Sequence, residues 1–136
     1  MISIIDINDS VKWDNIVKSF VQYDVYYLSG YVKAFQIHGD GTPQLLYYCE
    51  DDLKAIYVYM KRNTFIDGLY DCITPYGYGG VLFEGNTSND NLISFWNAYL
   101  KQMQDLNIVD NFVRYHPVLE NAIPMKSISE VIDLGK

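Results

Sequence analysis

The sequence lacks the features that membrane-spanning and secreted proteins require. In its 136 residues no apolar run approaches the roughly 18 residues of a membrane span, and no basic region precedes an apolar one at the N-terminus. We therefore expect a soluble, cytoplasmic protein. Cysteine is scarce, since only Cys49 and Cys72 are present, in unrelated segments without metal-ligand spacing. This usage is typical of reduced thiols and not of a disulfide framework.

Catalytic and ligand-binding motifs of recognisable spacing are also missing. The sequence contains no Gly-x-Ser-x-Gly nucleophile elbow, no Walker loop and no Gly-x-Gly-x-x-Gly that opens directly into a helix. The two histidines, His38 and His116, form no metal-ligand cluster, so no metal site is predicted. These absences leave the catalytic residues unidentified.

Basic residues are fewer than acidic residues. Ten lysines and arginines stand against seventeen acids, and the net charge is −7. An acidic surface repels a phosphate backbone, so we expect no tight binding of DNA or RNA, although a local basic pocket could still hold one anionic ligand. The hydrophobic share of 49% and the charged share of 20% are those of a folded domain, and the length suits a single one over residues 1–136.

Tyrosine, in contrast, is abundant. The chain has thirteen tyrosines, and aromatic residues make up 15% of it. Tyrosine stacks and hydrogen-bonds in recognition pockets. A genome biased toward Tyr, Ile, Asn and Asp would supply the same excess, so only clustered tyrosines indicate a site.

Hydrophobic periodicity predicts an α+β protein. Strands are expected at 1–6, 44–49, 53–60, 69–74 and 108–116, with a weak one at 127–134, and helices at about 10–21, 29–38 and 90–105. The almost continuously apolar run 53–60 indicates a central strand covered on both faces. Short connections make the three middle strands an antiparallel meander. The order β-α-α-β-β-β-α-β predicts helices on the faces of a mixed, mainly antiparallel sheet.

A loop rich in glycine and tyrosine follows the strand 69–74. In the segment Thr74-Pro-Tyr-Gly-Tyr-Gly-Gly80, three glycines within four residues let the backbone adopt positive φ and approach a ligand closely. Exposed amides in such a loop can form an anion-binding concavity, and Tyr76 and Tyr78 add two amphipathic rings. A tight turn with a bulge explains the same glycines without any ligand.

The second candidate is the segment Arg114-Tyr-His-Pro117 at the end of the strand 108–116. In a strand, Arg114 and His116 would point to the same face. The chain has only one other arginine, Arg62. Arg114 could hold a carboxylate or a phosphate with two hydrogen bonds. The alternative is an arginine that neutralises neighbouring acids, beside a histidine hydrogen-bonded at the strand terminus.

These segments resemble the N-terminal half of FemAB-like proteins, which belong to the GNAT-type acyltransferase superfamily. The similarity lies in the strand with its P-Y-G-Y-G-G loop, in the long helix carrying Phe95-Trp96, and in the V-R-Y-H-P segment. The opening is also similar, with a Trp-bearing first helix and Asp24-Val-Tyr-Tyr27 before a helix with Tyr31. The resemblance implies a GNAT-like fold and transfer of acyl or aminoacyl groups to a precursor of the cell envelope, such as peptidoglycan, or of a polysaccharide. It implies acetyl-CoA or aminoacyl-tRNA as the acyl donor.

The resemblance also implies which residues bind substrate: Tyr76, Gly77, Tyr78, Gly79, Gly80, Arg114 and His116. They would face the acceptor, a small molecule, a sugar nucleotide or a peptide. Catalysis in this family depends on positioning the amine and the acyl group, and His116 could reach an amine through a water. The sequence stops before the helix and hairpin that complete a GNAT domain, so we expect a piece of a two-domain protein that docks to a second such domain or forms a homodimer.

A different class of function remains open. Profilin-like and PAS-like modules share much of this element order, and their aromatic pockets bind small molecules without chemistry. The alternative hypothesis is therefore a non-catalytic ligand-binding or interaction module with a tyrosine-lined pocket.

Overall fold

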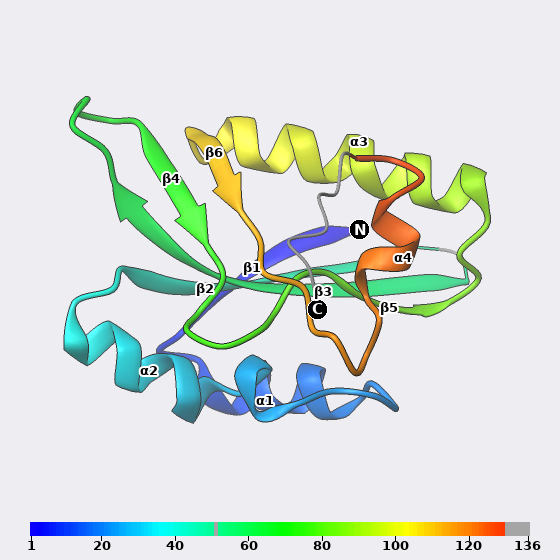
Figure 1. The fold of residues 1–136 in the computed structure, drawn as a ribbon, viewed down its shortest axis with the longest axis horizontal. Helices are drawn as coiled ribbons and strands as arrows, with labels where there is room; N and C mark the ends of the chain where they lie inside the picture. Colours follow the sequence, from blue (N-terminus) through cyan, green and yellow to red (C-terminus); the bar gives the residue numbers. More distant parts are fainter. Residues whose placement is uncertain (51, 130–136) are drawn as a thin grey trace.

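An open, six-stranded, mainly antiparallel sheet with helices on both faces forms the protein (Figure 1). The computed structural model describes residues 1–50 and 52–129. The elements are β1 (Ile2–Asp6), α1 (Ser10–Lys18), the 3-10 turn η1 (Val25–Tyr27), α2 (Ser29–His38), β2 (Thr42–Glu50), β3 (Leu53–Asn63), β4 (Tyr70–Ile73), β5 (Leu82–Gly85), α3 (Asn89–Asp105), β6 (Ile108–Phe112) and α4 (Ala122–Met125). The predicted α+β class is confirmed. The predicted element order lacked η1, β5 and α4.

The strands follow the order β1-β2-β3-β4-β6, and β5 also pairs with β3. Neighbours are antiparallel except for β4 and β6, which are parallel and are connected through α3. The predicted antiparallel meander is therefore confirmed as β2-β3-β4. The predicted central strand is β3, in which every residue from Leu53 to Met60 except Lys54 is buried.

Alternate side chains of β3 enter two separate cores because successive residues of a strand point to opposite faces. One core lies under α1 and α2 and includes Ile56, Val58 and Met60. The other lies under α3 and includes Tyr57 and Tyr59. Figure 1 shows α1 and α2 along one face of the sheet and α3 along the other. The sheet is thus a shared wall between the two cores.

β4 and β5 pair with the same edge of β3, and a loop separates them. β3 pairs with β4 through Met60–Asn63 and with β5 through Leu53–Ile56. Residues 74–81 leave the ladder between these two pairings. The glycine–tyrosine loop therefore interrupts what would otherwise be one long strand beside β3, and the chain resumes pairing in β5, which the sequence did not predict.

Two predicted strands at the C-terminal end differ from the structure. The strand predicted over 108–116 ends at Phe112, because its partner β4 ends at Ile73 and the loop takes over the hydrogen bonding beyond it. Arg114 and His116 therefore do not lie in a regular strand. In the predicted strand 127–134, residues 127–129 form a turn after α4, and the remainder lies outside the described residues.

Candidate functional site

Both ends of the glycine–tyrosine loop are hydrogen-bonded to the backbone of Arg114. The Arg114 N–H donates to Oγ1 of Thr74 at the start of the loop (3.1 Å), and the Arg114 carbonyl accepts from the N–H of Gly79 near its end (2.7 Å). An isolated parallel bridge then joins Gly79 to Tyr115. The two segments that the sequence singled out separately are therefore one structural unit.

A cleft of about 930 Å³ lies beside this unit. Met60, Ile73 and Phe112 line it from the neighbouring strands β3, β4 and β6. The turn between α2 and β2, residues 39–42, and the first part of the loop, residues 75–77, line its other sides. The volume lies in the range of small-molecule sites, roughly 300–1,000 Å³.

Basic side chains gather on this cleft although the chain is acidic. Lys61, Arg62 and Arg114 all line it. The Arg62 guanidinium makes two hydrogen bonds to the Asp71 carboxylate (2.8 and 3.0 Å), and the Lys61 ammonium lies 4.0 Å from the centre of the Tyr70 ring. Within residues 1–50 and 52–129, the Arg114 guanidinium has no hydrogen-bond or ion-pair partner. Arg114 is exposed, so its charge is available to an anion.

Aromatic side chains before and within α2 fix the loop in place. The Tyr31 hydroxyl donates to the Tyr76 carbonyl, and desolvation raises the pKa of Tyr31 above its ordinary value. The Tyr26 ring occupies the space that a Cβ on Gly77 would need, and Gly77 has φ +99°, so only glycine fits there. The Tyr76 ring packs on Phe35, with centroids 5.9 Å apart.

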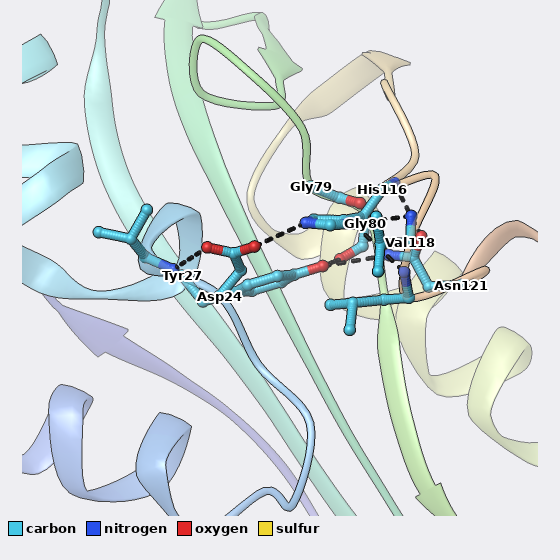
Figure 2. A network of polar contacts seen from close by, with 9 residues as sticks. Asp24, Tyr27, Gly79, Gly80, His116, Val118 and Asn121 are labelled. Atoms are coloured by element: carbon cyan, nitrogen blue, oxygen red, sulfur yellow. Dashed lines mark hydrogen bonds and ion pairs between the residues drawn. The ribbon is translucent and has the colours of Figure 1, made fainter. Parts of the chain in front are cut away.

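His116 belongs to a buried polar network (Figure 2). Its Nε2 donates to Oδ2 of Asp24 (2.8 Å), and its Nδ1 accepts from the N–H groups of Val118 (3.2 Å) and Leu119 (3.3 Å). Backbone N–H groups only donate, so the geometry assigns the ring proton to Nε2. The ring is 6% exposed and both nitrogens are occupied. This arrangement does not favour His116 as a base for an acceptor amine.

Asn121 connects the same network to the loop. Its Oδ1 accepts from the His116 N–H (2.9 Å), and its Nδ2 donates to the Gly79 carbonyl (2.7 Å) and to the Tyr27 hydroxyl oxygen (3.1 Å). The Tyr27 hydroxyl donates in turn to the Gly80 carbonyl (3.1 Å). Figure 2 shows Asp24 and Tyr27 pointing from the η1 region toward this network. The end of the loop is therefore bonded to segments from both halves of the chain.

The structure divides the predicted site residues into two neighbouring groups. Three of them line the cleft: Tyr76, Gly77 and Arg114. The other four lie in the buried network or pack beside it: Tyr78, Gly79, Gly80 and His116. The sequence did not nominate Asp24, Tyr27 or Asn121 as site residues. Their partners are as far as 94 residues away, so no local pattern identifies them.

The N-terminus of α3 does not fit the diphosphate of an acyl-CoA. The Ser88 side chain already accepts from the N–H of Asn91 (3.3 Å). The Asp52 carboxylate accepts from the side-chain amides of Asn86 (3.0 Å) and Asn91 (2.7 Å), and Asp90 adds a second acid in the first turn. Two carboxylates at this helix end would repel a diphosphate. These residues therefore do not form a binding site for an acyl-CoA, and no catalytic step that uses one is assigned to them.

Comparison of the chain with protein-family models, curated proteins and solved structures found no match. In the part of the chain that the structure describes, no three His, Cys, Asp or Glu side chains come together as a metal site. Within that same part, none of the helices combines the length and the apolar character of a membrane span. The fold and site define an α+β protein with a cleft of small-molecule size beside a clamped glycine loop, and its function must be argued from that site.

Proposed function

We propose that the cleft binds an anionic small molecule through Arg114, and that it is the acceptor site of a FemAB-like acyl- or aminoacyltransferase. The observation that carries the proposal is the bonding of the Arg114 backbone to Thr74 and Gly79, because it anchors the residue whose unpaired guanidinium lines the cleft beside the loop. A guanidinium without a protein partner can give two parallel hydrogen bonds to an anion.

Support for the transferase part of the proposal comes from the element order. A strand, two helices and an antiparallel meander precede α3 and β6, and apart from the additional strand β5 this order is consistent with the GNAT-like fold that the resemblance implies. In this proposal the chain contributes by binding and orienting the acceptor, which brings reacting groups together. The acyl donor, aminoacyl-tRNA or acetyl-CoA, would be held elsewhere, since α3 begins with two acids and the chain is acidic.

We also propose that the protein is cytoplasmic and that it docks to a second GNAT-like domain or to another copy of itself. β6 is an outer strand of the sheet order, and Val109 and Phe112 on it are exposed. Edge strands with exposed apolar residues are favourable sites for association. Sedimentation velocity at rising concentration tests this point, and a monomer at every concentration would contradict self-association.

The binding site is tested by Arg114→Ala. We expect this variant to retain the wild-type far-UV circular dichroism spectrum and melting temperature, because the side chain is exposed and unpaired. Binding of anionic acceptors, such as sugar nucleotides and peptides with a free carboxylate, should weaken strongly in a thermal-shift panel. A variant that melts cooperatively and binds these compounds as wild type does would overturn the assignment.

A non-catalytic ligand-binding module is the second candidate, favoured by a separate cavity. A space of about 570 Å³ lies between α3 and β6, and apolar and aromatic side chains dominate its lining, among them Trp96, Tyr99, Met103 and Met125. Such a lining suits an apolar ligand. Stabilisation of the protein by neutral apolar compounds alone, with a change in Trp96 fluorescence, would favour this function over acyl transfer.

A further inference from the structure

We infer that the anionic group held in the cleft is a phosphate rather than a carboxylate, and that the ligand is a phosphorylated small molecule. This inference rests on the proposed function, since it specifies the chemical class of the anion at the Arg114 site. It follows from the number of donors beside Arg114, from their rigidity and from the charges around them.

Backbone donors lie beside the unpaired guanidinium. Tyr76 and Gly77 line the cleft together with Arg114. Within the described residues, neither the Tyr76 N–H nor the Gly77 N–H donates a hydrogen bond. Unpartnered N–H groups around a left-handed glycine, such as Gly77 at φ +99°, are typical of anion-binding concavities.

The direction of the Gly77 N–H is set by the rest of the loop. The Tyr76 carbonyl accepts from the Tyr31 hydroxyl, and no peptide bond in the described chain is cis. In a planar trans peptide the N–H points opposite to the carbonyl, so the Gly77 N–H points away from Tyr31 and stays free of it. Tyr26 fills the space beside Gly77 and Arg114 holds the loop ends, which keeps this donor in place before any ligand arrives.

Basic side chains outnumber acidic ones on the cleft. Asp71 is hydrogen-bonded to both Nε and Nη2 of Arg62, and Asp40 lies 3.0 Å from the His38 ring. Among the described residues that line the cleft, three side chains are basic (Lys61, Arg62 and Arg114) and one, Asp40, is acidic. The local charge favours an anion even though the whole chain is acidic.

The number of donors distinguishes the two kinds of anion. An arginine fork satisfies both oxygens of a carboxylate with two parallel hydrogen bonds. A phosphate has further oxygens, which the two loop N–H groups can satisfy while the guanidinium binds the others. The cavity of about 930 Å³, with Met60, Ile73 and Phe112 on its walls, leaves room for the organic part of a phosphorylated compound.

The test is a titration of the ¹⁵N-labelled full chain, followed by its backbone amide resonances, at constant pH and ionic strength. Inorganic phosphate and sulfate are the tetrahedral probes, succinate is a dicarboxylate with the same charge as sulfate, and uridine monophosphate carries a phosphate on an organic body. We expect phosphate and sulfate to shift the Tyr76 and Gly77 amides saturably and to bind at least about tenfold more tightly than succinate. Uridine monophosphate should bind more tightly than inorganic phosphate.

Two variants complete the experiment. Arg114→Gln should weaken phosphate binding by about 10- to 100-fold, as the loss of a charged hydrogen-bond donor predicts. Lys101→Gln, an exposed position on α3, changes the net charge equally and should leave binding unchanged. If succinate binds as tightly as phosphate and Arg114→Gln weakens both, the phosphate inference is wrong and the anion site stands. If none of the probes binds, the proposed anion site itself is wrong.

Discussion

Asn121 connects the loop, the His116 backbone and Tyr27, and its replacement tests the network at the scale of one residue. Asn121→Ala would leave the buried His116 N–H and Gly79 carbonyl without the hydrogen bonds that Asn121 makes to them. It would also remove the hydrogen bond that the Tyr27 hydroxyl oxygen accepts from Asn121. Unsatisfied buried polar groups are costly, so we expect a loss of about 2–4 kcal/mol in the free energy of unfolding, measured by urea denaturation. Asn89→Ala, at an exposed position, is the matched control. A loss no larger than that of the control would contradict the structural role of Asn121.

Cys72 provides a second prediction for a single residue. Its thiol is buried, donates to Oδ1 of Asn111 (3.1 Å), and has its pKa raised to about 12 by burial. Cys49 is exposed. Because the thiolate is the reactive form, Ellman's reagent at pH 8 should modify Cys49 and leave Cys72 intact until the protein unfolds. In Cys49→Ser, a fast-reacting thiol under native conditions would show that this description of Cys72 is wrong.

At the residue scale, local chemistry pointed to only some of the residues that the structure brings together around the candidate site. A glycine-rich segment and a rare arginine can be recognised in the sequence without knowing their partners, and the structure places Gly77 and Arg114 at the same cleft. Asp24 and Asn121 have ordinary side chains whose importance comes from partners far away in the sequence, such as the 92 residues between Asp24 and His116. A single sequence contains no signal for such pairings.

At the scale of helices and strands, segments with a clear period were predicted well. The helix predicted at 29–38 has those bounds, and Gly39, at φ +100°, ends it. The helix predicted at 90–105 is α3, with Ser88 as its N-cap. Segments whose structure depends on a partner were not predicted. β5 has four residues, too few to display a period, and it is a strand because β3 extends beside it.

Glu84 joins β5 to the segment after α1, and the pH dependence of stability tests this link. Its carboxylate accepts from the Val21 N–H (2.7 Å) and pairs with Lys54 (2.9 Å), and these bonds lower its pKa. A carboxyl whose folded pKa lies below the unfolded value of about 4.3 stabilises the fold above that value, and the contribution is lost as the pH falls through the folded pKa.

We therefore expect Glu84→Gln to lose less stability than wild type when the pH is lowered from about 5 to 3. Urea denaturation at a series of pH values measures the slope. Asp67→Asn, which removes an exposed carboxylate in the turn between β3 and β4, is the control and should keep the wild-type slope. Equal slopes for wild type and Glu84→Gln would show that Glu84 makes no such contribution.

At the scale of the whole molecule, the two cores share β3, so they should unfold together. Trp13 is fully buried under the α1–α2 face, and Trp96 packs against the core under α3. Trp96→Phe leaves Trp13 to report on one core, and Trp13→Phe leaves Trp96 to report on the other. In each variant we expect the denaturation midpoint from tryptophan fluorescence to coincide with that from circular dichroism, because a strand buried on both faces couples them. Separate midpoints in either variant would mean that one core unfolds without the other.

The α+β class and the meander were predictable because they follow from local periodicity and short connections. The parallel pairing of β4 with β6, and the cleft lined by side chains of three strands, are products of chain topology. The two arginines, 52 positions apart in the sequence, line one cleft only because β3, β4 and β6 are neighbours. No pattern within a short window contains that information.

The long-range bonds around the loop also affect the order in which the protein is assembled during synthesis. β1, β2 and β3 can pair once the first 63 residues have left the ribosome. The loop reaches its bonded form only when Arg114, His116 and Asn121 have followed. Closing such long loops carries an entropic cost that the preformed sheet helps to offset. A nascent chain would thus pair β1, β2 and β3 well before the proposed anion site is complete, and binding through that site would be one of the last properties acquired.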